Sequence, residues 1–218
     1  MTDNLNDVVN STLENKKPRM PKWMVLLIIA GVSVGYIACN NSKGKSDASA
    51  TAEVAKSTNW AKASYGVFGL SVETPKKVLP GSLNLPDDVK KYIDRMDIFQ
   101  SDSANGLNIQ IVSAKYAAIV GEGNLQGAAN GAAAKMKSID GVTDFTSTDE
   151  HVATKDSIPG IIQRGSYKYN GTTDFEFVDA MYLKGLLYWQ VVIVYMGKDD
   201  ASKEIAKRVV GSIEIKPQ

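Results

Sequence analysis

The sequence predicts an α+β domain in which an antiparallel β-sheet, built around a three-strand meander, is flanked by two main helices. Three observations support this prediction. β-rich runs between residues 160 and 196 are separated by two-residue turns, an Ala-rich helical segment precedes them, and an amphipathic helical segment follows them. The chain has 218 residues, 44% of them hydrophobic and 22% charged, so we expect one folded domain with additional segments.

The folded domain is expected to begin at residue 65. Apolar residues alternate along YGVFGLSVETP, and the run ends at Pro75, which has no backbone donor, so a first strand is predicted here. Asp87 and Asp88 then begin a short helix or turn, because negative side chains favour the positive end of a helix. DIFQSD and LNIQIVSAKY are predicted as the next two strands.

The middle helix is predicted over residues 123–139, GNLQGAANGAAAKMKSI. Its small residues favour close packing on a sheet, although Gly127 and Gly131 each weaken the helix by about 1 kcal/mol relative to Ala. The preceding glycines, in GEGNLQG, lack the Lys that a phosphate-binding loop requires. We therefore expect them to form the turn before the helix.

Three β-rich runs give the strongest structural signal. They are GIIQRGSYKY, TTDFEFVDAMYL and LLYWQVVIVYM, separated by Asn170-Gly171 and Lys184-Gly185, the two-residue loops typical of hairpins. The third run is apolar at nearly every position, which predicts a central strand covered on both faces. Most aromatic residues of the meander are expected in the core, and any exposed ones are candidates for a partner surface. They are Tyr167, Tyr169, Phe175, Phe177, Tyr182, Tyr188, Trp189 and Tyr195.

A closing helix is predicted in DDASKEIAKRVVGSIEI. Asp199 and Asp200 are suited to capping its first turn, and an apolar stripe follows at helical spacing. The stripe consists of Ala201, Ile205, Val209 and Ile213. Both helices are expected to cover the sheet, on opposite faces in the favoured arrangement and on one face in the alternative.

Residues 65–218 resemble the PsbP-like family. The opening FGLSVETP, the long helix before the meander and the closing KEIAKRVVGSIEI carry this resemblance, which is one of topology. It implies an α/β/α sandwich and a role as an extrinsic binding or assembly factor, several members of the family being lipid- or membrane-tethered. No residue roles are transferred, because the family has no short catalytic signature.

An uncharged segment of seventeen residues, 23–39, precedes the domain and follows a basic flank. Such a run suits a bilayer, because charged residues at a helix centre are costly in hydrocarbon. The basic flank predicts a cytoplasmic amino terminus and an extracytoplasmic chain from residue 40 onward. The alternative is a buried core helix, which usually shows a polar stripe. The flank contains Lys16, Lys17, Arg19 and Lys22.

Cys39, the only cysteine, ends this segment in the sequence YIAC. YIAC resembles a bacterial lipobox, in which the Cys is acylated and becomes the new amino terminus, so Cys39 is the predicted lipidation site. Tyr36 in place of the usual Leu, and the length of the preceding segment, depart from the lipobox pattern. The alternative is an uncleaved signal anchor.

Four segments follow from these patterns. The polar, Ser- and Ala-rich stretch after Cys39 has no sustained apolar period and is predicted to be a tether. The segments are 1–22, a cytoplasmic leader or signal n-region; 23–39, a transmembrane or lipoprotein signal segment; 40–64, the flexible tether; and 65–218, the globular domain.

No catalytic, cofactor-binding or metal-binding residue is predicted. His151 is the only imidazole, and we expect it on an exposed strand, where adjacent Asp149 and Glu150 point to opposite faces and cannot both orient it. A single His and a single Cys also exclude zinc sites rich in these ligands. We therefore expect that the protein is not an enzyme and uses no cofactor.

The expected function is that of a membrane-tethered, extracytoplasmic binding or assembly module, periplasmic or at the cell surface, with a protein partner in the envelope. Nucleic acid is not expected as a partner, because the net charge is +1 and no segment forms a strong basic field. One alternative is an envelope enzyme or ligand sensor with a carboxylate-lined cleft. Another is a cytoplasmic partner for residues 1–22, which requires an uncleaved anchor.

Overall fold

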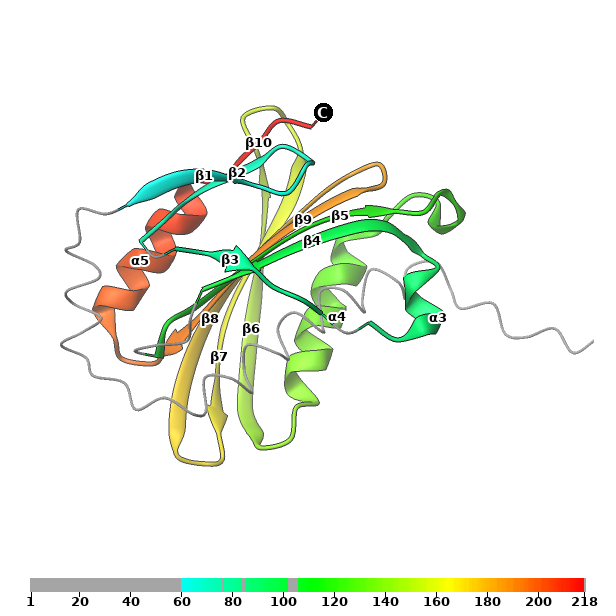
Figure 1. Ribbon diagram of the computed structural model, residues 1–218. Coiled ribbons are helices and arrows are strands. Elements are labelled where there is room, and N and C mark those ends of the chain that lie inside the picture. Colours follow the sequence, from blue (N-terminus) through cyan, green and yellow to red (C-terminus); the bar gives the residue numbers. More distant parts are fainter. Residues whose placement is uncertain (1–59, 76, 84, 102–105, 218) are drawn as a thin grey trace, which may run out of the picture.

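The computed structural model describes residues 60–75, 77–83, 85–101 and 106–217. In this part the chain forms two antiparallel sheets, of three and seven strands, with one long helix on each face of the larger sheet (Figure 1). The predicted segments 1–22 and 23–39, Cys39 and most of the predicted tether lie outside the described residues. No helix within the described ranges is long and apolar enough to span a membrane.

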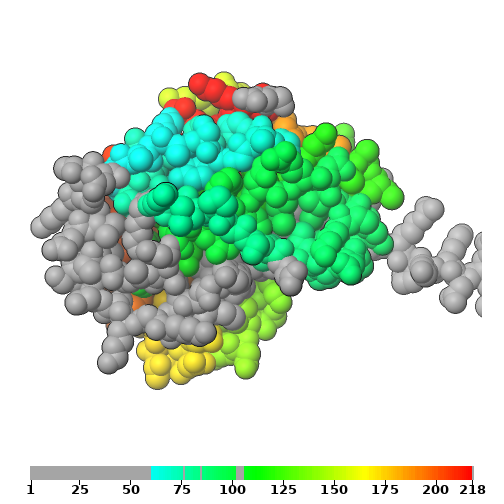
Figure 2. All heavy atoms as spheres, in the orientation of Figure 1, coloured from blue at the N-terminus to red at the C-terminus, as the bar shows by residue number. Residues whose placement is uncertain are grey.

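The smaller sheet joins the two ends of the described chain. Strands β1 (Ala61–Tyr65), β2 (Leu70–Thr74) and β10 (Glu214–Ile215) lie in the order β1-β2-β10. Gly66 and Gly69 both have positive φ angles in the tight turn between β1 and β2. β1 begins inside the segment that the sequence predicts to be a tether, so ordered structure starts before residue 65. In Figure 2 this hairpin forms one continuous surface with the neighbouring strands of the larger sheet.

The larger sheet has the order β3-β4-β5-β9-β8-β7-β6. Its meander is confirmed: β7 pairs with β8, β8 pairs with β9, and Asn170 and Gly171 adopt the positive φ angles of the predicted turn. The second loop is Gly185-Leu186 and not the predicted Lys184-Gly185, because Lys184 still pairs with Leu187 at the end of β8. β9 is the central strand and is buried along nearly its whole length, as predicted. The strands are β3 (Leu79–Pro80), β4 (Ile93–Gln100), β5 (Asn108–Tyr116), β6 (Val142–Ala153), β7 (Pro159–Tyr169), β8 (Thr173–Lys184) and β9 (Leu187–Met196).

Four helical elements accompany the sheets in the described residues. They are α3 (Asp87–Lys90), the 3-10 helix η2 (Ala118–Val120), α4 (Leu125–Lys137) and α5 (Asp200–Gly211). The predicted glycine-containing turn is found before α4, where Asn124 caps the helix by accepting a hydrogen bond from Gly127 N–H at 2.9 Å. Asp199 caps α5 as predicted, accepting from Ala201 N–H and Ser202 N–H.

Two apolar cores lie on opposite faces of the larger sheet. On one face, small residues of α4 such as Ala128 and Ala132 pack with Tyr188 and Phe177. On the other, residues of α5 and β2 pack with Trp189, whose indole N–H donates to the Phe68 carbonyl at 3.0 Å. The two long helices therefore lie on opposite faces, as expected.

The predicted fold class is wrong. The described chain is mostly β, with two antiparallel sheets, rather than an α/β/α sandwich around a three-strand sheet. The meander supplies only three of the seven strands in the larger sheet. On one face of the larger sheet, α5 and the smaller sheet both pack against the strands, so helices alone do not cover that face (Figure 1).

The error has a physical cause. Local patterns identify strands, but they do not show how many strands join one sheet, because that depends on pairing between distant segments. β10 illustrates the point: its two residues pair with Ser71 and Leu70 of β2. Helical spacing predicts that Ile213 continues the apolar stripe of the closing helix. This prediction is wrong, because α5 ends at Gly211.

Candidate functional site

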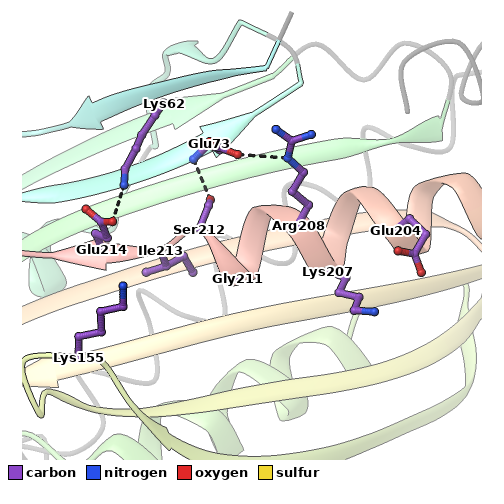
Figure 3. Close-up of a pocket in the computed structure, with 10 residues that line it drawn as sticks. All are labelled: Lys62, Glu73, Lys155, Glu204, Lys207, Arg208, Gly211, Ser212, Ile213 and Glu214. Atoms are coloured by element: carbon purple, nitrogen blue, oxygen red, sulfur yellow. Dashed lines mark hydrogen bonds and ion pairs between the residues drawn. The ribbon is translucent and has the colours of Figure 1, made fainter. Parts of the chain in front are cut away.

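A groove of about 630 Å³ lies between α5 and the smaller sheet (Figure 3). The last turn of α5, the start of β10, strands β1 and β2, and the turn between β6 and β7 all contribute to it. Seven of its ten lining residues carry ionisable side chains. The lining residues are Lys62, Glu73, Lys155, Glu204, Lys207, Arg208, Gly211, Ser212, Ile213 and Glu214.

The amphipathic pattern of α5 directs charge into this groove. Its buried residues, Ser202, Ile205, Ala206 and Val209, recur at helical spacing and face the larger sheet. Residues between them on the helix, including Lys207 and Arg208, are left on the solvent side. The same pattern that anchors α5 in the core therefore lines the groove with charged side chains.

Two ion pairs connect the walls of the groove. Lys62 Nζ on β1 lies 2.6 Å from Glu214 Oε1 on β10, and Arg208 Nε on α5 lies 3.1 Å from Glu73 Oε2 on β2. The Glu73 N–H also donates to Ser212 Oγ at 2.8 Å. The Arg208 guanidinium lies 3.9 Å from the centre of the Trp60 ring, a cation–π contact. Because these side chains are partly exposed, each ion pair contributes little to the free energy of unfolding.

Several lysines around the groove have no ion pair among the described residues. Lys155, on the turn between β6 and β7, and Lys207, on α5, line the groove without a carboxylate partner. A second hollow of about 220 Å³ shares Lys155, Ile213 and Glu214 with the groove and adds Lys216. The pKa of Glu214 is lowered, mainly by its contact with Lys62 and further by the charges of Lys216 and Lys155. Glu214 is therefore ionised at neutral pH and cannot serve as a proton donor there.

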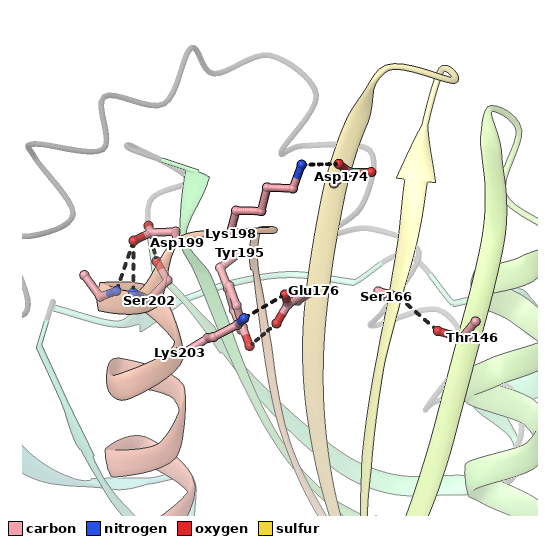
Figure 4. A network of polar contacts seen from close by, with 10 residues as sticks. Thr146, Ser166, Asp174, Glu176, Tyr195, Lys198, Asp199, Ser202 and Lys203 are labelled. Carbon is pink, nitrogen blue, oxygen red and sulfur yellow. Dashed lines mark hydrogen bonds and ion pairs between the residues drawn. The ribbon is translucent and has the colours of Figure 1, made fainter.

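A polar surface lies on the α5 side of β6, β7, β8 and β9 (Figure 4). Tyr195 O–H donates to Glu176 Oε2 at 3.1 Å, and Lys203 Nζ lies 3.1 Å from Glu176 Oε1. Burial, followed by the Glu176 charge, raises the pKa of Tyr195. Thr146 and Ser166 share a hydrogen bond of 3.0 Å between their hydroxyl groups. The Tyr195 phenol is thus held as a neutral donor to a carboxylate, not as a nucleophile.

A polar row also crosses the α4 face of the sheet. Asp179 on β8 is fully buried, and Gln190 Nε2 donates to both of its carboxyl oxygens at 2.9 and 2.8 Å. Next to it, Gln163 donates to Asp149 Oδ1 at 2.8 Å, and Gln126 of α4 donates to Asp149 Oδ2 at 2.8 Å. Burial raises the pKa of Asp179 to about 8; the Gln190 hydrogen bonds oppose this shift and the charge of Asp149 adds to it.

The residues considered in the sequence for catalysis do not form a reactive group. His151 lies on β6 and is exposed, as expected. Asp149 accepts from the two glutamines, and Glu150 forms an ion pair with Arg164 at 2.6 Å. The described ranges contain no group of three His, Cys, Asp or Glu side chains arranged to hold a metal ion.

Most aromatic residues of the meander lie in the core, as predicted, so they offer no exposed aromatic candidate for a partner surface. Seven of the eight aromatic residues are buried, and Tyr169 is half-buried. The groove could not be predicted from sequence, because Lys62 lies in the predicted tether and Lys155 lies in a segment without a recognisable motif. The one available signal was the run of charged residues, Lys203 to Arg208, on the solvent side of the predicted closing helix.

No protein-family model matches the chain, and no curated protein matches its sequence. Among solved structures, LpqN, involved in cell envelope biogenesis of Mycobacterium tuberculosis, is 13% identical with a TM-score of 0.41, covering 80% of this chain and 99% of its own. The extracellular domain of PknH from the same organism is 13% identical with a TM-score of 0.33, covering 76% of this chain and 90% of that domain.

A structure from Bacteroides thetaiotaomicron is 11% identical with a TM-score of 0.38, covering 68% of this chain and 46% of that one, so this chain spans less than half of its length. Two of the three similar structures are thus described as an envelope protein and an extracellular domain. At these identities and TM-scores they establish neither a shared fold nor a shared function. The resemblance to the PsbP-like family is not confirmed by any of them.

Proposed function

We propose that the protein is a membrane-tethered, extracytoplasmic binding module without catalytic activity, and that it binds an envelope partner in the groove between α5 and the smaller sheet. The uncharged segment 23–39 with its basic flank supports the membrane tether, and Cys39 is the proposed site of lipidation. β1 begins within the last residues of the predicted tether and supplies Lys62 to the groove.

The observation that carries this proposal is the state of the ionisable groups in the groove. Glu73 and Glu214 are held in ion pairs between different elements, while Lys155 and Lys207 keep their charges free of any ion pair within the described residues. General acid–base catalysis favours a group whose pKa lies near the working pH, whereas the pKa of Glu214 is lowered. Exposed charged side chains of this kind are suited to the recognition of a surface of opposite charge.

Photo-crosslinking in the native membrane tests this function. A photo-reactive amino acid replaces Lys207 in the full chain, and the matched control replaces Lys137, which is exposed on α4 on the opposite side of the sheet. We expect an adduct with an envelope protein from position 207 alone, and its loss when Lys155→Glu is added. The same adduct from both positions, or none from position 207, contradicts the proposal.

A second candidate, an envelope ligand sensor or enzyme that uses a carboxyl group, is favoured by Asp179. Its raised pKa near 8 is typical of functional carboxyl groups, and it lies in a row of polar side chains. None of the three hollows formed by described residues around α5 and on the sheet includes Asp179. If Asp179→Asn leaves the adduct at position 207 unchanged, the groove functions without this carboxyl group and the binding module is favoured.

A further inference from the structure

The end of the groove near β10 brings three lysines to one carboxylate. Glu214 and Lys216 are two residues apart on an extended segment and so point to the same side, while Ile215 between them is buried in the core. Lys62 reaches Glu214 from β1, at 2.6 Å. Lys155 lies across the second hollow, on the turn between β6 and β7, and its charge also acts on Glu214.

The turn that carries Lys155 is fixed by its own hydrogen bonds. Thr154 Oγ1 accepts from the Ile158 N–H at 3.1 Å, and the Thr154 carbonyl accepts from the Ser157 N–H at 2.9 Å. The Thr154 N–H donates in turn to the Ile158 carbonyl at 3.0 Å. Lys155 therefore lies opposite β10 on a turn that is already ordered. An anion that binds between Lys155 and β10 does not have to order this turn, so the entropy cost of ordering a loop is avoided.

The local charge is unbalanced. The ammonium groups of Lys62, Lys155 and Lys216 surround the Glu214 carboxylate, and only Lys62 is in an ion pair among the described residues. Asp156, beside Lys155, is a further acidic residue lining the second hollow. Over both hollows together, five basic side chains face four acidic ones, an excess of one positive charge; they are Lys62, Lys155, Lys207, Arg208 and Lys216 against Glu73, Asp156, Glu204 and Glu214.

We propose that this end of the groove is a binding site for a phosphate group held between Lys155 and Lys216. The proposal rests on the proposed binding function and names the chemistry that the groove recognises. Lysine binds phosphate as a point charge without demanding a fixed geometry, which suits two flexible side chains on opposite walls. The hollow of about 220 Å³ is large enough for such a group, and Ile213 offers an apolar contact to the atoms attached to it.

Two arms of one experiment identify the source of the anion. The full chain is placed in nanodiscs of phosphatidylcholine and titrated with inorganic phosphate, or placed in nanodiscs containing phosphatidylglycerol, at equal ionic strength. The readout is the acetylation rate of each lysine, measured by mass spectrometry. We expect Lys155 and Lys216 to be protected, and exposed Lys137 on α4 to be unaffected. Protection by inorganic phosphate indicates a soluble ligand, and protection only by phosphatidylglycerol indicates a lipid headgroup.

Charge variants give opposite expectations, which separates binding from damage to the fold. In the Lys155→Gln variant, the phosphate concentration that halves the acetylation rate of Lys216 rises by about fivefold, because one exposed ionic contact is lost. Glu214→Gln lowers it by about fivefold, because the competing carboxylate is removed while all three lysines stay. Absence of protection in both arms, or a change in the same direction in both variants, overturns the proposal.

The two proposals fail in different ways. If position 207 gives no adduct while phosphate or lipid protection still depends on Lys155, the anion site stands and the proposed protein partner is wrong. If the adduct forms but neither anion protects Lys155 and Lys216, the binding module stands and the anion site is wrong.

Discussion

Asp179 is a fully buried carboxyl group whose pKa lies far above its ordinary value. Its pKa is raised from 3.8 to about 8, so the folded protein keeps a proton that the unfolded chain releases between these values. The free energy of unfolding should therefore fall as the pH rises from about 4 to about 8, because the unfolded chain releases this proton first. The contribution is fully present below pH 4 and is lost above pH 8.

Asp179→Asn tests this linkage, because Asn keeps the shape but does not titrate. We expect a flatter dependence of the unfolding free energy on pH, with the variant gaining relative to the natural chain between pH 5 and pH 8. Urea unfolding of the full chain at these two values measures the difference. Parallel pH profiles for the two proteins would show that Asp179 does not hold its proton.

Gly69 is the glycine where a side chain meets the most severe obstacle. Its φ angle is +74°, and a Cβ atom would lie 1.8 Å from the Lys216 carbonyl oxygen. Gly69→Ala should lower the unfolding free energy by about 3 kcal/mol, because backbone strain adds to the displacement of the segment after β10.

Gly171→Ala is the matched control for this change. Gly171 has a similar φ angle of +68°, but a Cβ atom there meets no atom within 4 Å. Only the backbone cost of about 1 kcal/mol is expected. Equal losses in the two variants, measured by urea unfolding, would show that the contact with Lys216 has no energetic weight.

At the scale of the element, α5 depends on one capping residue. The Asp199 carboxylate accepts hydrogen bonds from the Ala201 and Ser202 N–H groups and, at 2.7 Å, from the Ser202 hydroxyl, which is buried. Asp199→Ala should lower the unfolding free energy by about 1 kcal/mol. Asp200→Ala, one position further on, removes only a charge near the helix start and should cost less. Thermal unfolding of both variants decides between them, and a larger effect of Asp200→Ala would contradict the assignment of the cap.

The elements that could be predicted from sequence are those with a local signal. Asn170-Gly171 fixes a hairpin turn, the apolar run of β9 indicates a central strand, and Asp199 marks the start of α5. β10 has no such signal, because two residues form a strand only when β2 lies beside them. The fold class was wrong for this reason: the joining of strands into sheets of seven and three is decided by contacts between distant segments.

The same limit applies to the groove. Its charged residues come from β1, β2, the turn between β6 and β7, α5 and β10, which are separated along the chain by other elements. Sequence alone predicted the apolar stripe of α5 but not what faces the opposite, charged side of the helix. The role proposed for Lys155 depends on its position across the hollow from Glu214, which the local sequence does not indicate.

At the scale of the whole molecule, the first quantity to measure is the intact mass of the protein extracted from its native membrane. The proposed lipoprotein lacks residues 1–38 and carries acyl mass on Cys39. A mass of 23.5 kDa, less at most the initiator Met, would contradict lipidation after cleavage and support an uncleaved signal anchor.

The pairing of β10 with β2 also has a consequence for biosynthesis. Glu73 on β2 donates its backbone N–H to Ser212 Oγ, two residues before β10 begins, and the two residues are 139 positions apart. A ribosome adds residues at roughly 5 to 20 per second, so the first hairpin waits several seconds or longer for its partner. A chain interrupted before β10 lacks Glu214 and Lys216, so neither the ion pair between Lys62 and Glu214 nor the proposed anion site can form.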